Sequence, residues 1–145
     1  MRLVVQRVNK ASVKIKEDIV GKIDAGLFVL VGVGESDTEK DAGKLAEKLA
    51  KLRIMSDKNG KMNHSIKEVQ GKLLAVSQFT LYADTTGGNR PSFIKAGKPE
   101  KAERLYEYFI ECLIKSGVEV ETGKFGAYMG INAFLDGPVT IILES

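Results

Sequence analysis

The chain has 145 residues, of which 43% are hydrophobic and 28% charged, and its formal net charge is +3. This composition is ordinary for a globular protein and excludes a disordered or low-complexity chain, so we expect one domain over residues 1–145. The mild basic excess is compatible with a polyanionic partner, but no basic run marks the chain as a dedicated nucleic-acid binder.

The number of cysteines and the length of the apolar segments indicate the cellular compartment in which the protein works. The only cysteine, Cys112, has no second thiol with which to form an intramolecular disulfide, which fits a reducing environment. Residues 1–7 contain two arginines and no long apolar run, so they do not have the pattern of a signal peptide. The apolar run at 27–33 is far too short to span a bilayer. We therefore expect a cytoplasmic protein without a membrane partner.

Strand-like segments open the chain. Residues 3–8 are rich in Val and Leu, and residues 13–16 alternate apolar and charged side chains, the period of two of a half-buried strand. A return strand is predicted at 19–23. The continuous apolar run at 27–33 is typical of a central strand that is buried on both faces.

Two amphipathic helices follow at different places in the chain. The first is predicted to begin near Ser36 and Glu39, which have capping-box spacing. The second has Pro99 in its first turn and ends at Gly117. The apolar stripes of the two helices comprise Ala42, Leu45, Ala46, Leu49 and Leu52 in the first, and Ala102, Leu105, Tyr106, Phe109, Cys112 and Leu113 in the second. Cys112 is thereby predicted to be a core residue and not a nucleophile.

Further strands are predicted at 73–82, around 118–120, around 134–135 and at 139–143, with a polar loop at 84–98. Strands therefore outnumber helices, and two helices cannot alternate with every strand. We predict an α+β fold with a mostly antiparallel, barrel-like sheet and two main helices packed outside it.

Most familiar catalytic constellations are missing from the sequence. The only histidine, His64, lies in a polar stretch and is predicted to be in a solvent-exposed loop, so a Ser-His-Asp triad has no evident base. One His and one Cys cannot make a structural zinc site, and no Gly-rich phosphate-binding motif occurs. We expect neither a metal nor a cofactor.

Polar residues interrupt the strand at 73–82. Ser77, Gln78 and Thr80 alternate with or follow apolar positions there. Buried polar groups cost about 1–3 kcal/mol when left unpaired, so a functional role and a simple solvent-facing end of the sheet are both open.

Two loops offer weaker signals. Arg90 lies in a Gly/Pro loop and could hold a phosphate or a carboxylate, although a plain surface loop is the default. Gly137-Pro138 separates two apolar segments, which by pattern alone indicates a turn with a trans peptide bond. Pro138 has no N–H, so this turn would leave carbonyl groups free.

Taken together and in order, the motifs of the chain resemble the D-aminoacyl-tRNA deacylase family from end to end. The motifs are Gln6-Arg7-Val8 with Ala11-Ser12-Val13, then Ser77-Gln78-Phe79-Thr80-Leu81, then Arg90-Pro91-Ser92-Phe93, then Asp136-Gly137-Pro138-Val139-Thr140. The resemblance implies homodimers that cleave D-aminoacyl esters from the 3′ end of tRNA, remove glycine from alanine tRNA and leave L-aminoacyl-tRNA intact. The implied partners are thus aminoacyl-tRNA and a second subunit, not DNA.

The resemblance also implies roles for single residues. Gly137 and Pro138, joined by a cis bond, enter the active site of the other subunit, where their carbonyl groups exclude an L side chain. Arg7 is implied to brace that loop of the partner. The pocket is implied to be lined by Ser77, Gln78, Phe79 and Thr80, with Phe125 and Met129 near the terminal adenosine.

The implied mechanism needs no side-chain base. Backbone N–H groups of Phe79 and Thr80 would steady the oxyanion, and the 2′-hydroxyl of the tRNA would assist hydrolysis. Thr80 itself has no evident base to activate it. Leu135 departs from the Asn that usually precedes Asp-Gly-Pro in the family. Candidates for phosphate contacts are Lys95, Lys98 and Lys101.

Two other functions stay open at this point. The chain could be an RNA-binding module that kept the fold without turnover, or a hydrolase of another acyl ester that uses the hydroxyl of Thr80 or Ser77.

Overall fold

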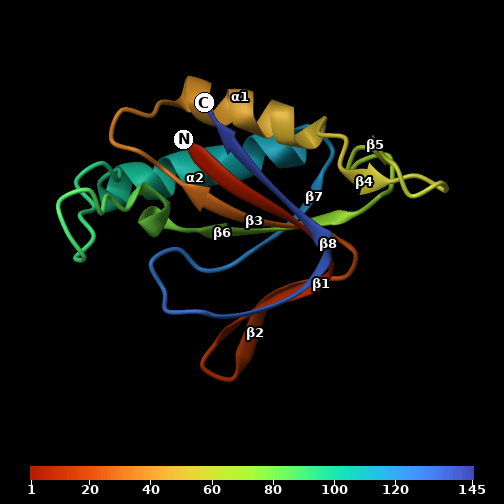
Figure 1. Ribbon diagram of the computed structural model, residues 1–145, viewed down its shortest axis with the longest axis horizontal. Coiled ribbons are helices and arrows are strands. Elements are labelled where there is room, and N and C mark those ends of the chain that lie inside the picture. The colour runs from red at the N-terminus through yellow and green to blue at the C-terminus, as the bar shows by residue number, and fades with distance from the viewer.

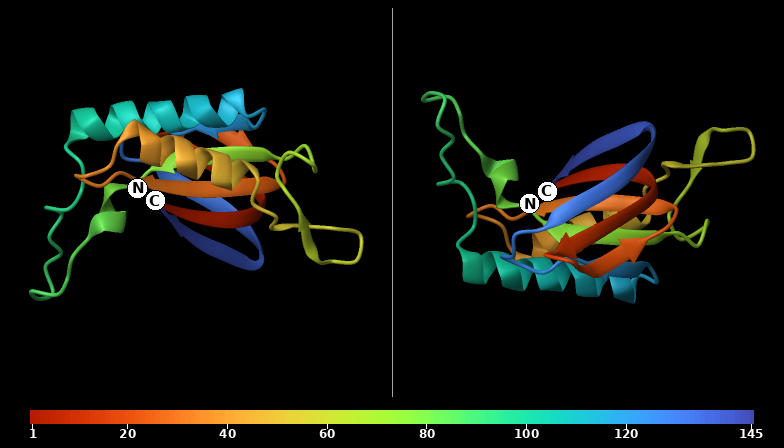
Figure 2. Two further views of the ribbon diagram at one scale, coloured as in Figure 1. Left: turned by 90° about the horizontal axis from the view of Figure 1, so that it is seen from above. Right: turned by 90° about the horizontal axis from the view of Figure 1, so that it is seen from below.

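Two helices lie over one face of a strongly bent sheet in the computed structural model, which describes residues 1–145 (Figure 1). The elements are β1 (Arg2–Ile15), β2 (Asp18–Ile23), β3 (Gly26–Gly32), α1 (Glu39–Ala50), β4 (Met55–Ser56), β5 (Met62–His64), β6 (Lys72–Ser77), a 3-10 helix (Phe79–Tyr82), α2 (Pro99–Lys115), β7 (Glu119–Thr122) and β8 (Gly130–Glu144). Seen from above, the two helices lie side by side over the strands and run roughly along them (Figure 2). The predicted α+β class with two helices outside a barrel-like sheet is confirmed.

The long strand β1 pairs with three other strands, β2, β3 and β8. One edge of β1 pairs antiparallel with β3 in its first half and with β2 in its second half, while its other edge pairs antiparallel with β8. The sequence predicted two separate strands here, but a single strand of 14 residues runs through both segments. This double use of β1 curls the sheet back on itself and makes it barrel-like.

The sheet is mostly antiparallel, as predicted, but it is mixed and contains two parallel pairs that the sequence did not predict. The order is β2-β1-β3-β6-β7, and the pairs β3–β6 and β6–β7 are parallel. Parallel neighbours need a long crossover, and α1 and α2 supply one each. Gly26 shows how close β3 and β6 lie, because a Cβ there would fall 1.9 Å from the carbonyl oxygen of Lys72.

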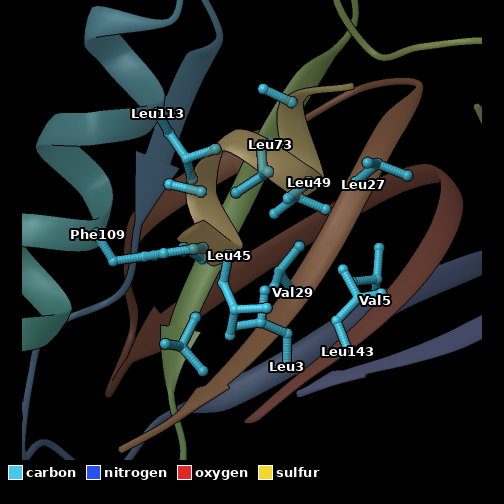
Figure 3. Packing of buried hydrophobic residues seen from close by; sticks show 14 of the residues in the cluster. Leu3, Val5, Leu27, Val29, Leu45, Leu49, Leu73, Phe109, Leu113 and Leu143 are labelled. Carbon is cyan, nitrogen blue, oxygen red and sulfur yellow. The ribbon is translucent and has the colours of Figure 1, made fainter. Parts of the chain in front are cut away.

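The main core fills the space between the helices and the sheet (Figure 3). Leu45 and Leu49 of α1 and Phe109 of α2 point onto Val29 and Leu73 of the neighbouring strands, and all five are fully buried. A smaller cluster on the other face of the sheet includes Val13, Phe28 and Leu74. The predicted apolar stripes of both helices thus face the core. Neither helix is both long enough and apolar enough to cross a membrane.

Several local boundaries differ from those predicted. Helix α1 is capped by Thr38 instead of Ser36, and the carboxylate of Asp41 accepts hydrogen bonds from the Thr38 N–H and hydroxyl at 2.9 and 2.7 Å. His64 lies at the end of β5, half exposed, and not in a loop. The predicted strand at 73–82 ends at Ser77 and gives way to a 3-10 helix. The short strands predicted near the C-terminus form one strand, β8.

Replacing Phe109 with Ala tests the helix-to-sheet packing. Phe109 is fully buried, so removal of its ring should lower the free energy of unfolding by about 3–5 kcal/mol. Urea denaturation measures this change. Ile114→Ala, at a position 55% exposed on the same helix, is the control and should change stability little. Equal losses in both variants would contradict the packing described.

Candidate active site

A cavity of about 810 Å³ opens at the carboxyl ends of β3 and β6. Because the two strands are parallel, their carboxyl ends meet at one edge of the sheet, where α2 and two loops complete the walls. Hydrophobic residues make up 13 of the 19 lining positions, the lining expected of a pocket for an organic ligand. The lining residues are Val31, Val33, Val76, Ser77, Gln78, Phe79, Phe93, Ala96, Gly97, Lys98, Pro99, Ala102, Tyr106, Phe125, Gly126, Ala127, Tyr128, Met129 and Ile131.

Five of the residues singled out from the sequence meet in this cavity. Ser77, Gln78 and Phe79 reach it from the end of β6, while Phe125 and Met129 reach it from the loop between β7 and β8. The two groups are about 50 positions apart in the sequence, and the parallel β6–β7 pairing brings them together. The structure therefore gathers the implied pocket residues, with the exception of Thr80.

Aromatic side chains frame the cavity in two pairs. The rings of Phe79 and Phe93 meet edge to face with centroids 5.0 Å apart, and those of Tyr106 and Phe125 lie 6.2 Å apart. The Tyr106 hydroxyl donates to the carbonyl of Ala75 at 3.0 Å, and burial raises the pKa of Tyr106 above its usual range. Sequence reasoning placed Tyr106 only in the core, whereas its ring serves both the core and the cavity wall.

Thr80 is exposed and does not line the cavity. Its hydroxyl oxygen accepts a hydrogen bond from the Gln78 amide at 2.6 Å. An amide N–H is a donor and not a base, so this contact orients Thr80 without activating it. His64 cannot act as the base either, because β5 lies at the opposite end of the molecule from the carboxyl end of β6 (Figure 1).

Two backbone N–H groups at the start of the 3-10 helix have no hydrogen-bond partner within that helix. The first hydrogen bond within this helix runs from the N–H of Leu81 to the carbonyl of Gln78. The N–H groups of Phe79 and Thr80 precede it, and the first N–H groups of a helix have no partner inside that helix. Both donors therefore lie beside the cavity edge formed by Ser77, Gln78 and Phe79.

Gly137 and Pro138 form an outward bulge of β8 and do not line this chain's own cavity. Residues 136–139 loop out opposite Arg7 alone, since Gln6 pairs with Thr140 and Val8 with Leu135. The Gly137–Pro138 bond is cis, as the family resemblance implied, whereas the dipeptide pattern alone favoured a turn with a trans bond. Both residues are exposed.

The backbone at Gly137 admits only glycine without strain. Its φ is +130°, a region that L residues rarely adopt, and a Cβ there would lie 2.6 Å from the amide nitrogen of Val139. Any side chain at this position must therefore move the bulge.

Arg7 supports the bulge from inside its own subunit. It is buried, and its Nε lies 2.7 Å from Oδ2 of Asp136 in an ion pair. Its Nη1 donates to the carbonyl of Ile54 at 2.8 Å and to the Ser56 hydroxyl at 3.1 Å. The resemblance implied that Arg7 braces the partner's loop, and within one subunit it is anchored to the residue that precedes Gly137. Leu135, by contrast, is 42% exposed, and its side chain offers no hydrogen bond to the bulge.

Of the three lysines proposed for phosphate contacts, one lines the cavity with its charge unpaired. Lys98 forms no ion pair and makes no side-chain hydrogen bond. Lys95 is bound to Asp84 at 2.7 Å, and this hydrogen bond holds the pKa of Asp84 well below its usual range. The amine of Lys101 donates to the carbonyl of Glu35. Arg90 is exposed in its loop and lies outside the cavity.

The family model and the relatives of known name point to the same family. The family model described as D-Tyr-tRNA(Tyr) deacylase matches residues 4–144. Proteins called D-aminoacyl-tRNA deacylase from Bacillus pumilus and Bacillus cytotoxicus are 57% and 56% identical over the whole chain and 99% of their own length. A solved structure called c-Myc DNA Unwinding Element Binding Protein is 41% identical, with a TM-score of 0.93 and coverage of 100% of this chain and 99% of that one.

A second solved structure supports the fold. It is described as a probable eukaryotic D-amino acid tRNA deacylase, is 14% identical, and matches 99% of this chain and 98% of its own with a TM-score of 0.87. The family model and the two Bacillus relatives thus define a deacylase, which is a hydrolase of acyl compounds. The chain belongs to the D-aminoacyl-tRNA deacylase family.

Asp136→Asn tests the anchoring of the bulge. The substitution keeps the shape of the side chain but leaves the buried Arg7 guanidinium without its anionic partner. We expect a loss of about 1–2 kcal/mol in the free energy of unfolding, measured by urea denaturation, with part of the pair screened because Asp136 is 42% exposed. The control is Glu119→Gln, which removes the surface partner of Lys72 and should have no measurable effect. An unchanged stability for Asp136→Asn would contradict the anchoring.

Proposed function

We propose that the protein hydrolyses the ester between a D-amino acid and the 3′ end of tRNA and so releases free tRNA and the D-amino acid. The observation that carries the proposal is the convergence of Ser77, Gln78 and Phe79 with Phe125 and Met129 on one apolar cavity. These are residues for which the family resemblance implies a place in the pocket. The size of the cavity suits a terminal nucleoside with its aminoacyl group.

The proposed reaction uses backbone groups and the substrate. Water adds to the ester carbonyl, and the N–H groups of Phe79 and Thr80 stabilise the negative oxygen that forms. The bond from the carbonyl carbon to the 3′-oxygen then breaks, and that oxygen takes up a proton. The neighbouring 2′-hydroxyl of the tRNA assists the proton transfers, because neither a carboxylate nor an imidazole lines the cavity.

Chiral selection is proposed to come from a second subunit. Gly137 and Pro138 project outward on a bulge and are absent from their own cavity, so they are available to enter the cavity of a partner. Their carbonyl groups would then crowd the α-carbon and exclude an L side chain. Glycine has no side chain to exclude, so glycyl-tRNA for alanine is proposed as a second substrate.

An apolar surface on β8 supports a homodimer. Large hydrophobic side chains are exposed along this strand on both sides of the bulge, an arrangement that marks protein interfaces more often than free surface. They are Ile131, Phe134, Leu135 and Ile142. The isologous contact of a two-fold dimer would bury both copies of this surface and deliver both bulges at once.

The compartment and the nucleic-acid partner follow from the substrate. We propose action in the cytoplasm, on tRNA and not on DNA, in line with the free thiol of Cys112. One of the solved relatives is named for binding to DNA. Competition of duplex DNA against tRNA in a filter-binding assay distinguishes the two ligands, and stronger binding of DNA would favour that second role.

Matched D- and L-tyrosyl-tRNA test the central proposal. The wild-type protein should release tyrosine from the D form only. Gly137→Ala should reduce the D-over-L preference by about tenfold or more, because the added methyl group must displace the bulge. Gly87→Ala, where a Cβ meets nothing within 4 Å, is the matched control. Equal hydrolysis of both forms by the wild-type protein would refute selection by the bulge, and tRNA binding without any turnover would favour a binding module.

The role of Thr80 is tested by two changes made separately. Thr80→Ala should lower the rate by less than about tenfold, since it removes one exposed hydrogen bond to Gln78. A substrate that ends in 2′-deoxyadenosine should lose about 10²- to 10⁴-fold in rate, the usual contribution of assisted proton transfer. Rapid-quench kinetics on both gives the comparison. The reverse pattern would indicate a hydroxyl nucleophile instead.

A further inference from the structure

Tyr128 is the most exposed large hydrophobic side chain at the cavity, with 98% of its surface accessible. It lies in the loop between β7 and β8, and its two neighbours in sequence, Ala127 and Met129, line the cavity as it does. Its ring therefore lies at the rim, in contact with solvent, while its backbone is part of the wall.

No intramolecular contact accounts for this ring. The other aromatic residues of the cavity are paired, Phe79 with Phe93 and Tyr106 with Phe125. Tyr128 belongs to neither pair, lies under no cation and makes no side-chain hydrogen bond. A flat aromatic surface that faces water beside a cavity is suited to stack on the face of another ring.

The charges around the cavity indicate the direction in which a polyanion can leave it. Lys98 lines the same cavity as Tyr128, and its amine forms no ion pair. A second hollow of about 500 Å³ shares Tyr106 and Phe125 with the cavity and is lined by three carboxylates, Glu103, Glu107 and Glu111, and by one amine, Lys124. The carboxylates outnumber the amine there, so that hollow disfavours phosphate, and a nucleic-acid strand whose last nucleoside occupies the cavity should leave past the residues of the cavity itself, where Tyr128 is exposed and Lys98 is the one charged residue.

We propose that Tyr128 is a stacking platform for the base of the nucleotide that precedes the terminal adenosine of the RNA. Stacking on an aromatic side chain uses only the face of the base. Because the 3′ end is common to all tRNAs, one platform at this position would serve every tRNA. Lys98 would meet the adjoining phosphate without reading sequence. This inference rests on the proposed function and adds to it a positioning residue outside the pocket of the scissile ester.

Two substrates separate this role from a structural one. D-aminoacyl-tRNA has the preceding nucleotide, and D-aminoacyl-adenosine lacks it. Tyr128→Ala should lower kcat/KM for the tRNA by about 5- to 100-fold through KM, with kcat kept, and leave the adenosine ester unaffected. Tyr128→Phe should restore the tRNA value because it keeps the ring, whereas Tyr128→Leu, which keeps only apolar bulk, should not. Ile114→Ala, an exposed residue near the end of α2, is the control.

A binding measurement completes the test. A single-stranded oligoribonucleotide with the sequence of the tRNA 3′ end, carrying no amino acid, is titrated against each variant, and the same order of affinities is expected. Equal losses on both substrates, rescue by Leu as good as by Phe, or a change in subunit association measured by sedimentation would each overturn the stacking role. An inactive wild-type protein would instead refute the proposed function, while the oligonucleotide titration would still decide whether Tyr128 stacks.

Discussion

The parallel pairing of β3 with β6 is the constraint on which the site depends. It places the carboxyl ends of both strands at one edge of the sheet, and Ser77 to Phe79 emerge at this edge. An antiparallel pairing would send one of the two ends to the opposite edge, and the cavity would lose a wall. The crossover through α1 that makes the pairing possible also supplies Leu45 and Leu49 to the core, so the site and the stability of the fold have a common origin.

Strand β1 connects this site-forming half of the sheet to the half that carries the bulge. Its register with β3 fixes the sheet beside the cavity, and its register with β8 forces residues 136–139 outward opposite Arg7. The guanidinium of Arg7 then joins the bulge to the segment of Ile54 and Ser56. The outward position of Gly137 is therefore set by strand pairing and by one buried cation, not by a flexible loop.

The periodic parts of the fold could be predicted from the sequence, and the non-periodic parts could not. The stripe that contains Leu105 and Phe109 and the apolar run of β3 led to correct elements because burial repeats with the period of the structure. The parallel order of β3 and β6 could not be inferred in the same way, because pairing depends on the crossover and not on local pattern. The 3-10 helix after Ser77 was predicted as strand, since a turn of four residues has no period of its own.

The candidate site was predictable to a similar degree. Local pattern left Ser77, Gln78 and Thr80 undecided, and only the order of all motifs along the chain pointed to one pocket. Tyr106 was missed as a wall residue because a helical stripe does not tell which of its members borders a cavity. Lys95 and Lys101 were indistinguishable from Lys98 in sequence, and only the contacts with Asp84 and Glu35 separate them.

The chemical nature of the cavity wall has a consequence for the conditions under which the site can work. Its polar groups are amides, hydroxyls and one amine, and none of the 19 lining residues is an Asp, Glu or His. Histidine is the side chain whose ordinary pKa lies between about pH 5 and 8, and the wall has none. The wall therefore contains no histidine switch, and an effect of mild acidification on hydrolysis must come from the water, the substrate or groups outside the wall.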